Sequence, residues 1–327
     1  MPISDAPREV SVDGPASQFR GRSRWIDLDR PLHYLDFGGP ADGAVIVCVH
    51  GLGGSAVNWS AIAPLLTDRY RVLAPDLAGH GLTQSRGRGT GVAANRVLLH
   101  RFIESGPGRP VILMGNSMGG MISLLEASAA PDAVAGLILI DPALPLVPSQ
   151  QDPLVTAMFV LGATPGVGRV MLGRRSRVAP EVLVASTMSL VCEDASRVPA
   201  DVVAQHVEMI LRRAGFTDVR RDLAVTTRSV VATLGFRGRA YRRGIGAITC
   251  PVLLLHGERD RVVPVAAARA IARANPSWTL VVLPGAGHVP QLEAADESAG
   301  VITEWLDAAG HPAVESATPG LGVNAPS

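Results

Sequence analysis

The sequence has 327 residues, of which 47% are hydrophobic and 18% are charged, and its net charge at pH 7 is +1. This composition predicts a chain that buries a sizeable core, and it excludes wholesale disorder. A charge so close to zero offers no basic face of the kind that nucleic-acid binding needs, so we expect no nucleic-acid partner. The length fits one large α/β domain with an insertion, or two domains.

The ends of the chain and the cysteines give a second set of expectations. Residues 1–18 lack a charged start followed by an apolar core, so they do not resemble a secretory signal. No apolar run reaches the roughly 20 residues that span a bilayer. We therefore expect a cytoplasmic protein without a transmembrane segment. The three cysteines, Cys48, Cys192 and Cys250, have no paired spacing typical of disulfides or zinc sites, and we expect no metal.

Residues 1–22 and 310–327 are rich in Pro, Ser, Gly and charged residues, and we predict flexible tails there. The first apolar segments between them, at residues 24–28 and 31–37, predict antiparallel strands at a sheet edge. Six further runs are continuous rather than alternating, as expected for parallel strands buried on both faces. These runs cover residues 45–49, 71–75, 111–114, 137–140, 252–255 and 280–283.

Segments of helical periodicity separate these runs. They cover residues 59–66, 92–103, 118–130, 266–274 and 299–308. This alternation predicts an α/β fold with a doubly wound, mostly parallel sheet, built from residues 23–141 and 248–309. After Asp141 the alternation stops, and residues 142–247 hold amphipathic stretches punctuated by prolines. We predict a helical cap there, inserted between two strands. Its expected helices cover residues 153–161, 180–191, 200–213 and 217–234.

The apolar run at 111–114 ends abruptly in Gly-x-Ser-x-Gly, from Gly115 to Gly119, and a helical segment follows. This order predicts a strand, a sharp turn and a helix, with Ser117 at the turn. Side chains at the two glycine positions would collide with the neighbouring strand and helix. Such a turn pushes the serine hydroxyl out of the sheet, so Ser117 is the candidate nucleophile.

A serine hydroxyl needs a base to take its proton, and the base needs a carboxylate to orient it. His288, in a loop after the last predicted strand, is the candidate base. Asp260, which follows the run at 252–255, is the candidate acid. Asp141, which ends the run at 137–140, is an alternative acid. The chain order Ser, Asp, His accompanies this kind of serine turn.

An anionic tetrahedral intermediate needs preorganised hydrogen-bond donors. The backbone N–H of Met118, directly after the serine, is one candidate. The second should come from the loop at residues 50–55, whose glycines let the backbone turn inward, and Leu52 N–H is the candidate there. We interpret His50 as a residue that shapes this loop rather than as a catalyst.

Together these motifs resemble the α/β-hydrolase superfamily, in its branch of esterases, lipases and C–C hydrolases with a helical cap. The resemblance covers residues 22–308 and rests on five segments in order. They are His50-Gly51-Leu52-Gly53-Gly54, Asp76-Leu77-Ala78-Gly79-His80-Gly81, Gly115-Asn116-Ser117-Met118-Gly119-Gly120, Gly257-Glu258-Arg259-Asp260 and Gly287-His288. The resemblance implies the α/β-hydrolase fold and implies no metal or organic cofactor.

These residues favour hydrolysis of carboxylic esters of small to medium hydrophobic substrates through an acyl-enzyme. C–C bond hydrolysis of dienoic ring-cleavage products is the enzymatic alternative, because Asn116 and Met118 are similar to that group's serine turn. Val289 departs from that group, which tends to have Trp after the histidine. A hydrophobic-ligand binding protein is the non-enzymatic alternative, and the complete triad argues against it. The sequence leaves the physiological substrate and the oligomeric state open.

Overall fold

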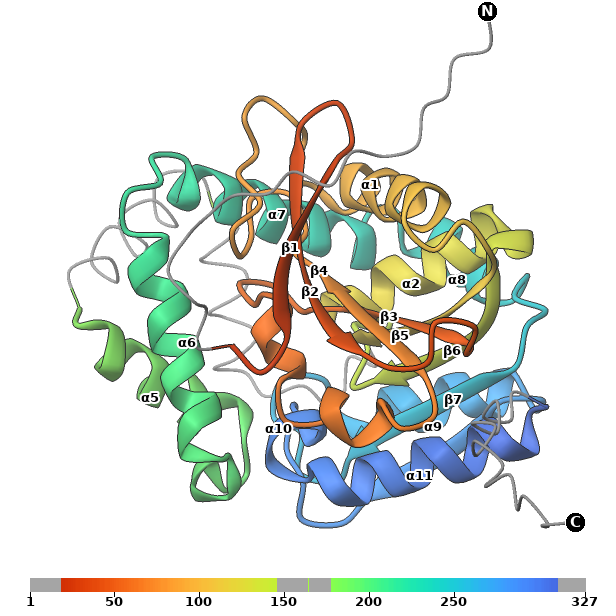
Figure 1. The fold of residues 1–327 in the computed structure, drawn as a ribbon. Coiled ribbons are helices and arrows are strands. Elements are labelled where there is room, and N and C mark those ends of the chain that lie inside the picture. The colour runs from red at the N-terminus through yellow and green to blue at the C-terminus, as the bar shows by residue number, and fades with distance from the viewer. Residues whose placement is uncertain (1–18, 146–163, 165–177, 311–327) are drawn as a thin grey trace, which may run out of the picture.

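The structure is a computed structural model that describes residues 19–145, 164 and 178–310. Within these residues eight strands form one sheet, in the order β1-β2-β4-β3-β5-β6-β7-β8 (Figure 1). The strands are β1 (Arg22–Asp27), β2 (Pro31–Gly38), β3 (Val45–Val49), β4 (Arg71–Pro75), β5 (Val111–Asn116), β6 (Val134–Ile140), β7 (Val252–Gly257) and β8 (Thr279–Leu283). β2 runs antiparallel to β1 and to β4, and the other neighbouring strands are parallel. The predicted mostly parallel sheet is confirmed.

Burial explains why the strands could be predicted closely. Every residue of β3, β5 and β7 is buried. A strand that is covered on both faces needs apolar residues at consecutive positions, which the continuous runs supply. Each predicted strand is present, with bounds within three residues of the expected ones.

Helices cover both faces of the sheet, as a doubly wound fold requires (Figure 1). One core joins the strands to α1 (Val92–Ser105), α2 (Met118–Ala129), α8 (Gly238–Ile245) and α9 (Val265–Ala274). The core on the other face contains α11 (Ala295–Ala308) and two 3-10 turns. These turns, at Ala56–Trp59 and Ala63–Leu66, replace the helix predicted at 59–66, which was wrong. Pro64 has no backbone N–H for a helix bond to the carbonyl of Ser60, and its ring would clash with that carbonyl.

Three helices of the predicted cap are present: α5 (Pro180–Val191), α6 (Ala200–Arg212) and α7 (Val219–Leu234). The helix expected at 153–161 lies outside the described residues. α5 and α6 lie beyond one end of the sheet (Figure 1) and share a third apolar cluster with Leu292. The helix α8 was not predicted. It packs against α2, because Tyr241 and Ile245 are buried in the core of that face.

The described residues begin inside the range predicted as a tail. Phe19 is buried and belongs to the core that also contains α11 and the two 3-10 turns. Residues 1–18 and 311–327 lie outside the described residues. Among the described helices, none has both the length and the hydropathy that a membrane span requires.

Candidate active site

Ser117 lies at a strained turn between β5 and α2. Its φ of 55° and ψ of −117° are values that residues with a side chain rarely adopt. Two backbone hydrogen bonds hold the turn: Ser117 N–H donates to Ile140 C=O at 3.1 Å, and Ala143 N–H donates to Ser117 C=O at 2.9 Å. The end of β6 and the residues after it therefore stabilise the conformation that presents the serine.

Close packing accounts for the glycines around Ser117. A Cβ atom on Gly119 would lie 1.8 Å from the carbonyl oxygen of Val49, and one on Gly115 would lie 2.7 Å from Gly119 O. A Cβ on Gly120 would lie 2.6 Å from Pro142 Cβ. The serine turn can approach β3 and the segment after β6 only because these three residues have no side chain.

His288 and Asp260 come together as predicted. His288 Nδ1 lies 2.7 Å from Asp260 Oδ2, and the Asp260 side chain is fully buried. The other oxygen, Asp260 Oδ1, accepts the N–H groups of Val262 and Val263 at 2.7 and 2.9 Å. Burial acts to raise the pKa of Asp260, but the charge of His288 and its hydrogen bond lower it below the ordinary value. Asp260 is thus an ionised carboxylate that can orient and stabilise a protonated imidazole.

Asn116 connects the serine turn to the loop of His288. Its Nδ2 atom donates to the carbonyl oxygens of Ile140 and His288, both at 3.1 Å. Among the described residues, no hydrogen bond joins the Ser117 hydroxyl to the His288 ring. Bonds of this kind are often long without substrate and tighten when it binds. The contact through Asn116 fixes the His288 loop beside the turn of Ser117.

The loop after β3 lies directly against Ser117. A Cβ on Gly51 would be 3.2 Å from Ser117 Cβ. His50 holds this loop, because its Nδ1–H donates to Gly51 O at 2.8 Å and its Nε2 accepts the N–H of Leu77 at 3.1 Å. Burial lowers the pKa of His50, so the ring is a neutral structural group. The interpretation of His50 as a residue that shapes the loop agrees with these contacts.

The backbone N–H groups of Leu52 and Met118 are the candidate oxyanion donors. Within the described part of the chain, neither Leu52 N–H nor Met118 N–H donates a hydrogen bond. Met118 is the first residue of α2, where N–H groups have no partner inside the helix and the helix dipole favours negative charge. Among the described residues, both N–H groups thus lack a partner and are available to a substrate oxygen.

The described part of the predicted cap contacts the loops that carry Asp260 and His288. His288 N–H donates to the C=O of Val191, the last residue of α5, at 2.7 Å. The Arg261 guanidinium donates to Ser189 O and Cys192 O, both at 2.9 Å. The end of α5 thus holds the backbone of His288 through a hydrogen bond.

Glu293 supports the same loop and was not identified from the sequence. It lies in α10 (Pro290–Glu293), is buried, and accepts the N–H groups of Gly287 at 2.7 Å and Glu193 at 2.9 Å. The feature of the sequence that could have indicated this role is a carboxylate within the mostly apolar segment after His288. Gly287 is near in sequence, but Glu193 is 100 residues away, so the link that Glu293 makes between the two segments required the structure.

Asp141, the alternative acid, does not contact the His288 ring. Its Oδ1 accepts Gly257 N–H at 2.9 Å and lies 3.3 Å from His256 Nε2. Among the described residues, the ring of His288 is hydrogen-bonded to Asp260 and not to Asp141. The geometry therefore favours Asp260 as the acid.

The cluster behind His288 contains groups that could in principle bind a cation. Atoms of Asp141, His256 and Asp260 lie within 4.8 Å of one another. His256 Nε2, however, donates to Val263 O at 2.9 Å and so carries a proton. The Asp260 oxygens already accept hydrogen bonds from backbone N–H groups and His288. The three residues form a hydrogen-bonded network rather than a vacant coordination site.

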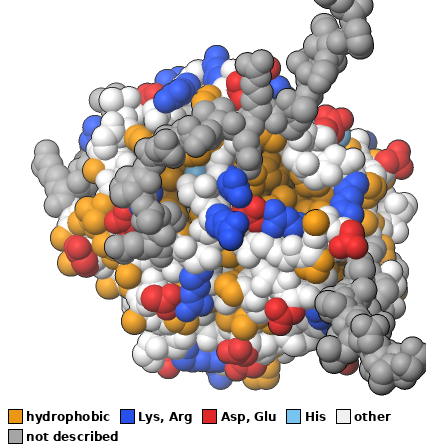
Figure 2. Space-filling view, in the orientation of Figure 1, with side chains coloured by type: hydrophobic (Ala, Val, Ile, Leu, Met, Phe, Trp, Pro, Cys, Tyr) orange, Lys and Arg blue, Asp and Glu red, His pale blue; other side chains and the backbone are white. Residues whose placement is uncertain are grey.

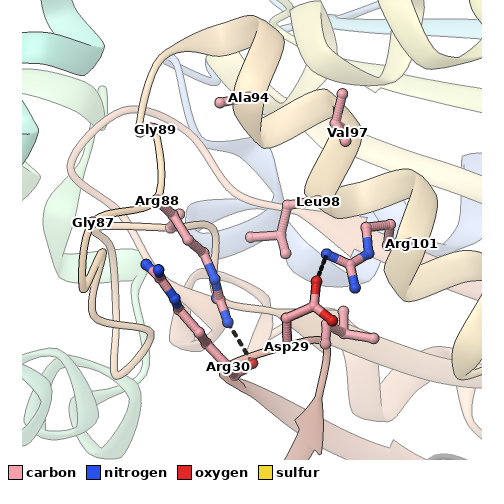
Figure 3. Close-up of a pocket in the computed structure, with 11 residues that line it drawn as sticks. Asp29, Arg30, Gly87, Arg88, Gly89, Ala94, Val97, Leu98 and Arg101 are labelled. Carbon is pink, nitrogen blue, oxygen red and sulfur yellow. Dashed lines mark hydrogen bonds and ion pairs between the residues drawn. The ribbon is translucent and has the colours of Figure 1, made fainter.

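A groove of about 420 Å³ lies elsewhere, between the β1–β2 turn, residues 87–89 and α1 (Figure 3). Its lining combines Leu98 with Arg88 and with Arg101, which points at Asp29 and pairs with it at 2.7 Å. None of the candidate catalytic residues lines this groove. Basic and acidic side chains are interspersed on the face in Figure 2. Because no candidate catalytic residue lines it, the groove is separate from the candidate active site.

Comparison with known proteins identifies the family. The model of the alpha/beta hydrolase fold family matches residues 44–295. The chain belongs to this family. The matched range includes Ser117, Asp260 and His288 in the predicted order, and the family predicted from the motifs is confirmed. The chain is accordingly an α/β-hydrolase enzyme.

Relatives with this fold carry diverse names. The chain is 30% identical over 274 residues to the dihydrolipoyllysine-residue acetyltransferase component of the acetoin cleaving system of Pseudomonas putida, covering 82% of this chain and 64% of that protein. It thus spans less than two thirds of that relative's length. It is 28% identical over 318 residues to the magnesium-chelatase 30 kDa subunit of Rhodobacter capsulatus, covering 92% of this chain and 99% of that protein.

A named esterase is also among the relatives. The pimeloyl-[acyl-carrier protein] methyl ester esterase of Aromatoleum aromaticum is 28% identical over 272 residues, covering 79% of this chain and 96% of that protein. Among solved structures, the 2-hydroxy-6-oxo-6-phenylhexa-2,4-dienoate hydrolase of Rhodococcus sp. strain RHA1 has a TM-score of 0.66 at 21% identity, covering 92% of this chain and 99% of that one. This likeness shows that the fold is shared.

Proposed function

We propose that this protein is a serine hydrolase that cleaves carboxylic esters of small to medium hydrophobic substrates through an acyl-enzyme. The observation that carries the proposal is the buried His288–Asp260 pair, with 2.7 Å between Nδ1 and Oδ2, fixed beside the strained turn of Ser117. A serine at such a turn has little reactivity until a base is positioned for it. The pair supplies that base together with its orienting carboxylate.

The proposed reaction proceeds in two halves. As Ser117 Oγ attacks the ester carbonyl carbon, His288 Nε2 takes the hydroxyl proton and Asp260 stabilises the resulting imidazolium. Leu52 and Met118 N–H groups bind the oxyanion. His288 then protonates the leaving alcohol, and the acyl group remains on Ser117. A water molecule, deprotonated by His288, releases the acid and restores the serine.

Two observations favour esters over the C–C bond alternative. The residue after His288 is Val289, where C–C hydrolases tend to have Trp. The relatives include a methyl ester esterase that this chain matches over 96% of that protein's length. The same triad can serve C–C hydrolysis, so a ring-cleavage product belongs in the substrate panel. Another relative, which this chain matches over 99% of that protein's length, is named as a magnesium-chelatase subunit rather than as an esterase. The test therefore measures labelling of the serine as well as turnover.

The test compares p-nitrophenyl acetate, butyrate and octanoate with a dienoic keto acid in wild-type protein and two variants. Ser117→Ala should lower kcat for esters at least ~10³-fold and abolish labelling by a serine-directed fluorophosphonate. Ser186→Ala is the matched control, because Ser186 is an exposed serine on α5. It should keep wild-type turnover and labelling.

Three results would count against ester hydrolysis. A kcat/KM more than about tenfold higher for the keto acid, roughly 1.4 kcal/mol of transition-state discrimination, would favour C–C hydrolysis. Neither turnover nor labelling in the wild type would favour a binding protein. Equal labelling of wild type and Ser117→Ala would place the nucleophile elsewhere.

A further inference from the structure

Two carboxyl groups lie side by side behind His288, and the proposed triad uses only one of them. The side chains of Asp141 and Asp260 are both completely buried. Both approach one ring nitrogen, His256 Nε2, which lies 3.3 Å from Asp141 Oδ1 and 3.5 Å from Asp260 Oδ2. The sheet brings them together, because Ile140 on β6 pairs with Leu255 on β7 and each acid follows one of these strands.

The donors around the two acids are unequally shared. Asp260 accepts two backbone N–H groups and faces His288 Nδ1. Asp141 Oδ1 accepts the N–H of Gly257, but its Oδ2 is buried without a hydrogen-bond partner in the described part of the chain. The His256 Nε2 proton is donated to Val263 O. Donors for a second carboxylate are therefore lacking, and a buried charge without them is strongly unfavourable.

The surrounding charges also oppose a second anion. The ionisable groups that face the two acids are His256 from β7, His288 from the loop after β8, and Glu293 from α10. Two carboxylates at this separation repel, and one of them retains a proton. Asp260 has the cationic partner and the donors, so Asp141 is the one that stays neutral.

We propose that Asp141 is a positioning residue that keeps its proton at the enzyme's working pH and donates it towards Asp260. The two acids then carry one negative charge, held on Asp260 next to His288. The catalytic consequence rests on the proposed function: the added donor keeps Asp260 ionised, and its loss makes Asp260 easier to protonate.

The electrostatics of the cluster agree with this assignment. Burial, and after it the charge of Asp260, raises the pKa of Asp141 well above its ordinary value. His288 has the opposite effect on Asp260, whose pKa is lowered although burial acts to raise it. Burial also lowers the pKa of His256, so that ring does not supply a second positive charge.

The backbone makes one substitution especially informative. Asp141 has a φ of 44°, a left-handed conformation that Asp and Asn tolerate better than other residues with side chains. Asp141→Asn preserves this turn, can still accept Gly257 N–H through Oδ1, and offers an N–H donor in place of the O–H. Asp141→Leu has a similar size but neither donor nor acceptor.

The experiment measures pH profiles of kcat for p-nitrophenyl butyrate in wild type, Asp141→Asn and Asp141→Leu. Asp141→Asn should keep kcat within about threefold and leave the acidic limb in place. Asp141→Leu should lower kcat at least about tenfold and move the acidic limb to higher pH, because Asp260 has lost a donor. Rescue by Asn but not by Leu is a result that shape alone does not produce.

Infrared difference spectra give a second measurement that does not depend on turnover or on the folding of the Leu variant. Wild type minus Asp141→Asn at pH 7 should show the carbonyl stretch of a protonated carboxylic acid, and Ser117→Ala should retain that band. Absence of the band, or equal activity of the Asn and Leu variants, overturns the proposal. A loss of about 10³-fold in Asp141→Asn also overturns it, since an ionised Asp141 would then be required. If the wild type fails to hydrolyse esters, the proposed function fails while the infrared result still decides the position of the proton.

Discussion

Gly119 is the position at which one added methyl group should damage the site most. It lies in the first turn of α2, and a Cβ there would be 1.8 Å from Val49 O, 2.5 Å from Val49 C and 2.7 Å from His50 O. Real Cβ atoms essentially never come within 3.0 Å, so the contact with Val49 O requires a shift of about 1.2 Å (3.0 minus 1.8 Å). The atoms that must move are backbone, so no change of rotamer relieves the clash.

The shift should affect both stability and catalysis. Overpacking of this kind costs about 1–3 kcal/mol, and the better helix propensity of Ala offsets about 1 kcal/mol of it. We therefore expect Gly119→Ala to be destabilised by about 1 kcal/mol, and by no more than about 2 kcal/mol. Val49 and His50 lead directly into the loop of Leu52. A displacement of about 1 Å near reacting groups can cost about 10²-fold in rate, and we expect kcat to fall by that order.

A second glycine provides the matched control. Gly300 lies within α11, and a Cβ there would meet no heavy atom within 4 Å. Gly300→Ala should therefore gain about 0.5–1 kcal/mol of stability with unchanged kcat. The assays are urea unfolding followed by far-UV circular dichroism and turnover of p-nitrophenyl butyrate. If Gly119→Ala matched the wild type in both assays, the close approach of α2 to β3 would be wrong.

Three further predictions concern Ser117, Asp260 and Asp141. Ser117→Gly and Ser117→Ala should both be inactive, but the Gly variant should be more stable by about 1 kcal/mol in thermal unfolding, because Gly adopts a φ of 55° without strain; equal stabilities would argue against a strained turn. Asp260→Asn should lower kcat at least ~10³-fold at pH 7, and a near-native rate would remove Asp260 from the triad. The pKa of Asp141 is raised in the folded protein well above the value near 3.8 expected for the unfolded chain. Its contribution to stability is therefore complete below pH 3.8 and is lost as the pH rises towards the pKa of the folded state. In urea unfolding between pH 5 and 8, Asp141→Asn should therefore gain on the wild type by up to about 1.4 kcal/mol per pH unit, whereas parallel pH dependences would contradict the raised pKa.

The fold was largely predictable because its strands are short, continuous apolar runs. Both β3 and β4 have the bounds predicted for them, since burial on two faces requires apolar residues at consecutive positions, and Arg71 at the start of β4 is the one polar residue in these two strands. The helix α8 was missed for the opposite reason. Its eight residues include three arginines and two glycines, and of its larger side chains only Tyr241 and Ile245 are buried, too few to give a helical pattern.

The candidate site was predictable only where its residues sit in linear motifs. Ser117, Asp260 and His288 each follow a recognisable strand, so their types and spacing indicated them. The support given by Asn116 and Glu293 depends on loops that meet in space. The contact between Asp141 and the acid loop likewise depends on the register of β6 and β7, which no local pattern encodes.

An acyl-enzyme on Ser117 can be trapped and located. The protein is quenched in acid during turnover of p-nitrophenyl butyrate and examined by intact-protein and peptide mass spectrometry. We expect a single butyryl adduct on the peptide that contains Ser117, and no adduct in Ser117→Ala. Turnover without any adduct, or an adduct on another residue, would contradict the assignment of Ser117 as the nucleophile of an acyl-enzyme mechanism.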